Sequence, residues 1–175
     1  MDYTLRPALL AAMLFASTAA FAAPADDLKE AQKLYGQGKL FAAQEKVDAF
    51  LTAQPKDPQG RFLKGLVLAD MKKNIEAIQV FTAMTEEFPE LPEPYNNLAV
   101  LYAAQGNYER ARAVLELAIQ TNPQYAMAHE NLGDIYAQMA ARAYDRALQL
   151  DKDNASAKAK SAKVKELTST QRINP

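Results

Sequence analysis

The feature that most constrains this 175-residue chain is a proline that recurs at a constant spacing. Pro55, Pro89 and Pro123 are equally spaced along the chain. Small residues follow the same period in two further columns: Ala31, Gly65 and Ala99, then Ala43, Ala77 and Ala111. A fixed period in the range of about 20–50 residues indicates stacked repeats, because one short unit cannot bury its apolar face alone. The sequence therefore predicts a single domain built from similar units.

Each unit carries apolar residues at helical spacing on two successive segments. In the third unit these positions are Leu98, Leu101 and Tyr102, then Ala111, Val114, Leu115 and Ala118. Apolar residues three and four apart form one face of a helix. Small residues let two antiparallel helices approach closely, and a proline at the unit boundary ends one helix before the next begins. We therefore expect an all-α fold of stacked helical hairpins with a concave surface.

The third unit, "PEPYNNLAVLYAAQGNYERARAVLELAIQTNP", resembles the tetratricopeptide repeat (TPR). The matching residues are Tyr95, Leu98, Ala99, Tyr102, Gly106, Tyr108, Ala111, Leu115, Ala118 and Pro123. The first unit departs from the pattern at Glu30 and Val47, and the second has "KKN" in place of a glycine turn, where we expect Asn74 to be left-handed. The resemblance spans about Ala25 to Ala157 and implies a TPR helical-hairpin solenoid of three full repeats and a degenerate fourth.

The fourth unit lacks the residues of a turn. The third unit runs sixteen residues from Tyr102 to Ala118, whereas the fourth runs only eleven over the corresponding interval, from Tyr136 to Ala147. The five absent residues are those of the turn, and the interval contains no Gly or Pro. We therefore predict that the two halves are fused into one helix from about Ala126 to Leu150, roughly 37 Å long at 1.5 Å per residue.

A helix of that length exposes part of its apolar stripe beyond its shorter neighbours. The residues expected to be exposed are Met139, Ala143, Tyr144 and Leu148. Two ways of covering them are open. The segment from Ala155 to Leu167 folds back as a capping helix, or a second copy of the chain covers the stripe and forms a homodimer by helix exchange.

Residues 1–22 have the order of a secretory signal peptide. Arg6 precedes an apolar run from Ala8 to Ala16, and cleavage is expected after Ala22, with Ala20 as the alternative. The run is shorter than the roughly 20 residues of a membrane anchor, and without Cys the chain cannot be a lipoprotein. The sequence predicts an exported, soluble periplasmic protein, with a TPR domain at residues 23–157 and a capping segment with a flexible basic tail at residues 158–175.

The composition argues against an enzyme and against nucleic-acid binding. The chain has 20 Lys and Arg residues against 21 Asp and Glu residues, without a basic block suited to phosphates. It contains no Cys and one His, and neither a glycine-rich phosphate loop nor an H-E-x-x-H pair is present. His129 falls in the column of Arg61 and Tyr95, which favours a packing role. We expect no catalysis, no cofactor and no metal site.

The family's concave columns, transferred one residue at a time, yield a candidate peptide groove. Its residues are Gln59, Phe62, Leu66, Asp70, Asn96, Asn97, Val100, Glu130, Asn131, Asp134 and Gln138. The amides of Asn97 and Asn131 either hold the backbone of an extended segment or bond a neighbouring helix. Members of the family that capture a C-terminal carboxylate have Lys or Arg in this groove. Because Asp70, Glu130 and Asp134 occupy inner columns here, we expect a neutral or basic segment of another protein.

The C-terminal tail is locally basic. Lys158, Lys160, Lys163, Lys165 and Arg172 stand against Glu166. The tail either forms a solvated end cap or adheres to an anionic envelope surface. The sequence as a whole predicts a periplasmic adaptor or scaffold that binds a segment of another cell-envelope protein. The alternative is a chaperone-like holdase that shields many unfolded clients.

Overall fold

The computed structural model describes residues 24–169, and all the regular structure in this range is helical. The helices are α1 (Pro24–Gly36), α2 (Leu40–Ala53), α3 (Pro58–Asp70), α4 (Asn74–Glu87), α5 (Pro92–Ala104), α6 (Tyr108–Thr121), α7 (Ala126–Leu150) and α8 (Ala155–Ser169). The expected signal peptide at residues 1–22 and Arg172 in the tail lie outside the described residues. The predicted all-α fold of helical hairpins is confirmed.

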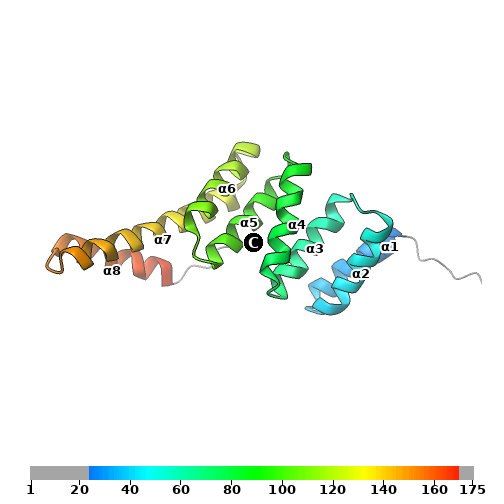
Figure 1. Cartoon of the computed structure of the whole chain (residues 1–175), viewed down its shortest axis with the longest axis horizontal. Coiled ribbons are helices and arrows are strands. Elements are labelled where there is room, and N and C mark those ends of the chain that lie inside the picture. The colour runs from blue at the N-terminus through cyan, green and yellow to red at the C-terminus, as the bar shows by residue number, and fades with distance from the viewer. Residues whose placement is uncertain (1–23, 170–175) are drawn as a thin grey trace, which may run out of the picture.

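The first six helices form three antiparallel hairpins that stack in chain order (Figure 1). The second helix of each hairpin also packs against the first helix of the next, as α2 does against α3. Three apolar clusters therefore follow one another along the stack, within α1–α3, α3–α5 and α5–α7. The result is the continuous core that a repeat protein needs, because no single hairpin could bury its own apolar face.

The turn inside each full hairpin uses one left-handed residue at the same repeat position. The φ angles are 71° at Gly38, 62° at Lys72 and 72° at Gly106. In all three turns the next backbone N–H donates to the carbonyl five residues earlier, at 2.9 Å, which is the Schellman ending of a helix. The expectation that Asn74 is left-handed is wrong, because Lys72 takes that conformation and Asn74 is the first residue of α4.

Gly65 allows α3 and α4 to approach closely. A Cβ atom built on Gly65 would lie 2.5 Å from two ring carbons of Phe81, whereas carbon atoms in ordinary contact are about 3.5–4.0 Å apart. Phe81 is fully buried, and its ring centroid lies 5.7 Å from that of Phe62 on α3. The absence of a side chain at Gly65 thus makes room for the largest residue that α4 contributes to the core.

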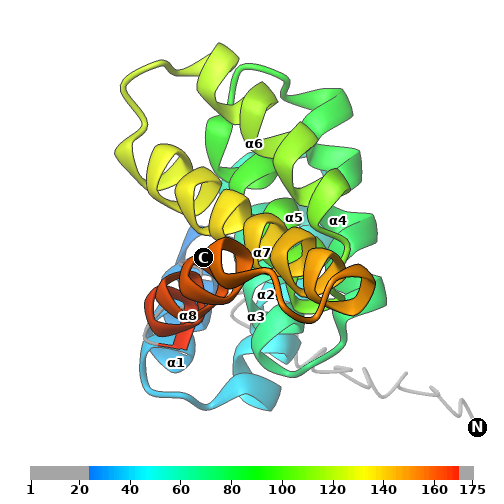
Figure 2. The same ribbon diagram turned by 90° about the vertical axis from the view of Figure 1, so that its left-hand side faces the viewer.

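The helix α7 runs without a break from Ala126 to Leu150, as the missing turn predicts. Its N-terminal part packs on α5 and α6, and its C-terminal part extends away from the stack (Figure 1). Helix α8 folds back along α7 as a capping helix, and Figure 2 shows the two side by side. Asp145 of α7 lies 2.7 Å from Lys165 Nζ and accepts a hydrogen bond from the Ser161 hydroxyl at 3.1 Å. These contacts hold α8 on one side of α7.

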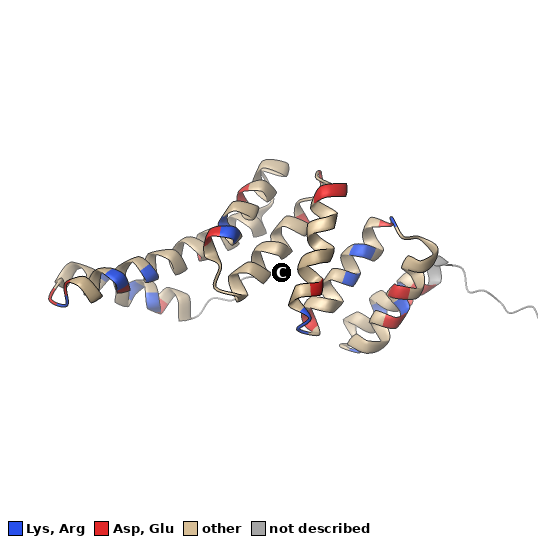
Figure 3. Ribbon diagram, viewed as in Figure 1, with Lys and Arg blue, Asp and Glu red and all other residues tan. Residues whose placement is uncertain are grey.

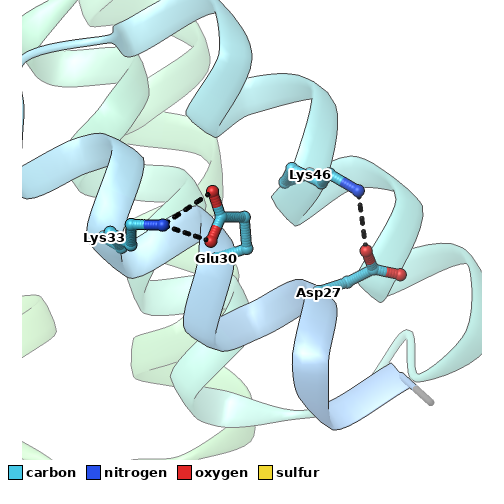
Figure 4. Close-up of polar contacts among 4 residues, drawn as sticks. All are labelled: Asp27, Glu30, Lys33 and Lys46. Carbon is cyan, nitrogen blue, oxygen red and sulfur yellow. Dashed lines mark hydrogen bonds and ion pairs between the residues drawn. The ribbon is translucent and has the colours of Figure 1, made fainter. Parts of the chain in front are cut away.

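One ion pair joins the two helices of the first hairpin, and a second lies within α1. Lys46 Nζ of α2 lies 3.0 Å from Asp27 Oδ1 of α1, and Lys33 Nζ pairs with Glu30 one turn earlier at 3.1 Å (Figure 4). Exposed pairs of this kind contribute little to stability. They do place a carboxylate beside each of these two lysines, so the first hairpin presents neither as an isolated positive charge.

Candidate functional site

The first helices of the three hairpins enclose a groove of about 640 Å³. Helix α3 supplies Gln59, Phe62 and Leu66, three of the residues predicted from the sequence. The remaining residues that line the groove are Gln32, Pro58, Leu63, Met84, Leu91, Glu93 and Pro94. The groove therefore lies between α1, α3 and α5, with buried Leu63 and Met84 at its base.

The chemistry of this groove is apolar with amide groups and one carboxylate. Phe62 and Leu66 are half-buried and supply apolar surface, while Gln32 and Gln59 are exposed amides that both donate and accept hydrogen bonds. Glu93 is the charged residue of the lining, and none of the described residues that line the groove is Lys or Arg. Such a surface suits a segment with apolar side chains and offers no cation to a carboxylate.

Two lining residues that the sequence reasoning missed lie in columns it had already identified. Gln32 stands one repeat before Leu66, and Glu93 stands one repeat after Gln59. The repeat period would therefore have located Gln32 and Glu93 if the concave columns had been extended to the first unit and to the start of the third. Leu63 also stands in such a column, one repeat before Asn97, whereas Pro94 lies in the column of Gly60, which was not among the predicted concave columns.

Asp70 does not line this groove but joins two first helices. The Tyr35 hydroxyl of α1 donates a hydrogen bond to Asp70 Oδ2 of α3 at 2.8 Å. Partial burial, and then the hydrogen bond and charge of Asp70, raise the pKa of Tyr35 to about 12. Asp70 therefore acts as an acceptor that links α1 to α3, at the C-terminal end of α3.

The expectation that Asn96, Asn97 and Asn131 are exposed in the groove is wrong. Asn96 and Asn131 are 0% exposed, and Asn97 is 5% exposed. The Asn131 side-chain amide donates to Asn96 Oδ1 at 2.8 Å, which joins α7 to α5. The Asn97 amide donates to the carbonyl of Glu93 on its own helix at 3.0 Å. Of the two roles considered for these amides, the bond to a neighbouring helix is the one that Asn131 has, because the helices close over this column.

The other predicted residues on α5 and α7 lie outside the lining of the groove. Asp134 is buried, which also departs from the expectation, and burial followed by the charge of Glu130 raises its pKa. Gln138 Oε1 accepts a hydrogen bond from the Tyr108 hydroxyl at 3.4 Å. Val100 is half-buried and Glu130 is exposed. The structure thus brings Gln59, Phe62 and Leu66 together and separates them from the predicted residues of the later repeats.

The predicted exposed stripe of the long helix is only partly open. Met139 packs against the core cluster of α5, α6 and α7, whereas Ala143 is exposed. Tyr144 and Leu148 are half-buried, and Lys160 Nζ of α8 lies 5.9 Å from the centre of the Tyr144 ring. The exposure expected at Met139 is therefore wrong, since α6 still reaches this position. Helix α8 covers one side of the residues that follow.

The basic residues of the C-terminal segment gather on α8, at the left in Figure 3. Three of the four lysines are engaged with their surroundings: Lys165 with Asp145, Lys160 with the Tyr144 ring and Lys158 with Asp153 at 3.9 Å. Engagement with α7 favours the end-cap interpretation of this segment over an adhesive tail.

His129 has a structural hydrogen bond that recurs in its column. Its Nε2 lies 3.0 Å from the carbonyl oxygen of Pro123. Arg61 Nε donates to the carbonyl of Pro55 at 2.7 Å. The Tyr95 hydroxyl lies nearer to the carbonyl oxygen of Thr85, at 3.2 Å, than to that of Pro89, at 3.5 Å. His129 and Arg61 thus bond the proline that precedes their repeat, which gives His129 a structural role.

Residues 24–169 contain neither a metal-binding cluster nor a membrane-spanning helix. No group of three or more His, Asp or Glu side chains within this range is arranged to hold a metal ion. None of the helices α1 to α8 is long and apolar enough to cross a membrane.

Comparison with known proteins identifies the repeats. Models of the tetratricopeptide repeat match residues 28–92 and 68–135. Cell division cycle protein 27 homolog A of Arabidopsis thaliana is 33% identical over 86 residues, which make up 48% of this chain and 11% of that protein. The chain therefore corresponds to a small part of that relative.

Solved structures share the fold. A thermophilic TPR protein of Thermus thermophilus has a TM-score of 0.63 and 22% identity, over 83% of this chain and 82% of that chain. The first TPR of Spaghetti (RPAP3), solved with the HSP90 peptide SRMEEVD, has a TM-score of 0.62 and 18% identity, over 67% of this chain and 93% of that chain. The chain therefore belongs to the tetratricopeptide-repeat family, and its fold is that of a scaffold for protein–protein interaction.

Proposed function

We propose that this protein is an adaptor that holds a segment of another cell-envelope protein in the groove between α1, α3 and α5. The observation that carries the proposal is the groove itself, in which apolar surface from Phe62 and Leu66 is flanked by the amides of Gln32 and Gln59. Apolar pockets anchor side chains, and amides satisfy the polar backbone of an extended segment. The complex of the Spaghetti TPR with an HSP90 peptide supports a peptide as the class of ligand.

The segment is proposed to be neutral or basic. Glu93 stands in the wall of the groove and is the one charged residue among the described residues that line it. A peptide such as SRMEEVD, with two glutamates and a terminal aspartate, would meet like charge here and no lysine or arginine among the lining residues. Like charges across an interface disfavour binding, so the ligand differs in charge from that peptide.

Export to the periplasm is a separate part of the proposal, and it rests on the order of residues in the N-terminal segment. Fusing residues 1–30 to a phosphatase that is active only after export tests it. Activity in the periplasm supports the assignment, and replacing Leu9 and Leu10 with Arg should abolish that activity. Equal activity of the two fusions would contradict a signal peptide.

Capture of partners from an envelope extract tests the adaptor. Leu66→Glu places a charge on the apolar wall, and Leu117→Glu is the matched control, because Leu117 lies on α6 and is 44% exposed outside the groove. After crosslinking, we expect the wild type and the control to recover the same one or two proteins and Leu66→Glu to lose them. Equal recovery by all three proteins would place the binding surface elsewhere.

The holdase alternative is favoured by large apolar side chains exposed away from the groove. Phe41 on α2 is 81% exposed, and Ile75, one repeat later on α4, is 73% exposed. Suppression of the aggregation of several unrelated unfolded proteins would support a holdase, particularly if Phe41→Ser and Ile75→Ser abolish it. Recovery of one defined complex, unaffected by those two substitutions, supports the adaptor.

A further inference from the structure

The fourth repeat contains the sequence of both helices but forms no hairpin, and this leaves one face of α7 without its usual neighbour. In the three full repeats, the first helix packs along the second helix of the same hairpin. In α7 the two halves lie end to end in one helix. The residues that pair with each other in the earlier repeats therefore cannot meet within one chain.

In the first half of α7, the absence of a second helix as neighbour is evident at Gly133. This residue continues the column of Ala31, Gly65 and Ala99, which are all buried against the second helix of their hairpin. A Cβ atom at Gly65 would collide with Phe81, but one at Gly133 would meet nothing within 4 Å. Tyr136, three residues later, is 49% exposed. A position built for close helix contact thus faces open space.

The second half of α7 also lacks its usual neighbour, which in the full repeats is the first helix of the same hairpin. In the full repeats, three columns of the second helix are at most 2% exposed: Ala43, Ala77 and Ala111; Val47, Phe81 and Leu115; and Phe50, Met84 and Ala118. The corresponding residues of α7, counted with the five-residue gap, are Ala140, Tyr144 and Ala147. All three remain partly exposed although α8 packs beside them. The core clusters among the described residues likewise include nothing of α7 beyond Met139.

The sizes of the residues in these columns match pairwise. Where the second helix has an aliphatic residue, Val47 or Leu115, the first helix has alanine. Where the second helix has the aromatic Phe81, the first helix has Gly65, in direct contact. Tyr144 is again aromatic, and the residue in its partner column is Gly133. The fourth repeat therefore keeps the complementary pair of the second repeat, although its members lie eleven residues apart on one helix, about 16 Å at 1.5 Å per residue.

We propose that a second copy of this chain completes the fourth repeat by reciprocal exchange, with two α7 helices packed antiparallel along their whole length. Gly133 of each copy then receives Tyr144 of the other. The two-fold axis passes between Gln138 and Met139, midway between Gly133 and Tyr144, and Gln138 is also the middle residue of α7. In the register that the repeat columns set, the two α7 helices thus overlap over their whole length.

No helix of either chain has to separate from its neighbours for this exchange. The core contacts of α7 with α5 and α6, at Ala128, Leu132 and Ile135, and the contacts of Asp145 with α8 lie on other faces and are retained. On the face to be covered, the Tyr144 ring lies 5.9 Å from Lys160 Nζ of α8. The face to be covered carries no charged residue between Ala126 and Ala147. Its positions, all at least partly exposed, are Ala126, His129, Gly133, Tyr136, Ala140, Ala143, Tyr144 and Ala147. Too short a hinge is a known cause of exchange between identical chains, and here the turn of the hairpin is absent altogether.

Restoring the turn gives the first test. The residues absent from the fourth repeat correspond to Gly106–Arg110, so the sequence Gly-Asn-Tyr-Glu-Arg is inserted between Met139 and Ala140. We expect light scattering to give the wild type twice the mass of one chain and the insertion variant the mass of one chain, with helix content retained in circular dichroism. A monomeric wild type at high concentration overturns the proposal. A dimeric variant overturns exchange through α7.

Disulfide formation tests the register, and it does not depend on the insertion variant folding. The chain has no Cys of its own. Under oxidation, Gly133→Cys with Tyr144→Cys should form a covalent dimer, whereas each single variant should remain uncrosslinked, because identical positions lie about 16 Å apart in the antiparallel pair. Crosslinking by the single variants, or none by the double variant, overturns the antiparallel register. Neither test involves the groove, so both outcomes are independent of the adaptor role.

Discussion

Replacing Gly65 with Ala tests the contact that holds α3 against α4. The new methyl carbon would lie 2.5 Å from two ring carbons of Phe81, about 1 Å inside ordinary carbon contact. Phe81 is fully buried and packs on Phe62, so its ring has no free space to enter. The overpacking should cost about 1–3 kcal/mol, against a gain of up to about 1 kcal/mol from removing a helical glycine. We expect a net loss of up to about 3 kcal/mol in the free energy of unfolding.

The third repeat supplies the matched control. It has Ala99 at the column of Gly65 and Leu115 at the column of Phe81, both buried. In a Phe81→Leu background, Gly65→Ala should therefore become neutral or stabilise by up to about 1 kcal/mol. Urea unfolding of the four proteins, followed by circular dichroism, measures the coupling free energy between the two sites. A coupling below about 0.5 kcal/mol would refute the argument that these side chains compete for one space.

Three further predictions concern single side chains. Lys72→Gly should raise the free energy of unfolding by about 1 kcal/mol, because a φ of 62° strains a residue with a side chain; an unchanged urea midpoint would contradict this. Asn131→Ala should lower it by about 1–3 kcal/mol, because it removes a buried hydrogen bond to Asn96, and a change too small to measure would mean that the bond is unimportant. The pKa of Tyr35 is raised from 10.0 to about 12 in the folded chain, so the unfolded chain loses this proton first. The stability linked to Tyr35 is present below pH 10 and is lost between about pH 10 and 12. The wild type should therefore lose more stability than Tyr35→Phe over that window in urea unfolding, and equal losses would exclude the linkage.

The repeat architecture was predictable because it depends on local sequence and on a period. The first helix of each full hairpin ends where a left-handed residue allows a Schellman turn, and the constant repeat period places those residues at Gly38, Lys72 and Gly106. The absence of the corresponding residues in the fourth unit led to the single helix Ala126–Leu150, whose ends agree with the structure. Only the left-handed residue of "KKN" was misplaced, because Asn has a higher intrinsic preference for that conformation than Lys, whereas the turn has Lys72 there and Asn74 begins α4.

The candidate groove was predictable only in part. Gln59, Phe62 and Leu66, three of the residues proposed from the sequence, line it, because their helix lies between two others whose side chains do not close over them. The column of Phe62 behaves differently on α5, since Asn96 is closed off by its contact with Asn131 of α7. A helical period assigns residues to a face. Whether that face is open depends on the side chains of the neighbouring repeat.

The sequence alone therefore determined the number of full hairpins, the place of each turn and the length of α7, because backbone conformation follows from residues close together in the chain. Tertiary structure decided which concave positions are accessible and which side of α7 is covered by α8. Those properties depend on the distances and angles between helices, which result from the combined packing of many side chains. The open face around Gly133 and Tyr144 required both the sequence and the structure. The repeat columns show which residues it should contact, and the folded chain shows that this contact does not form within one chain.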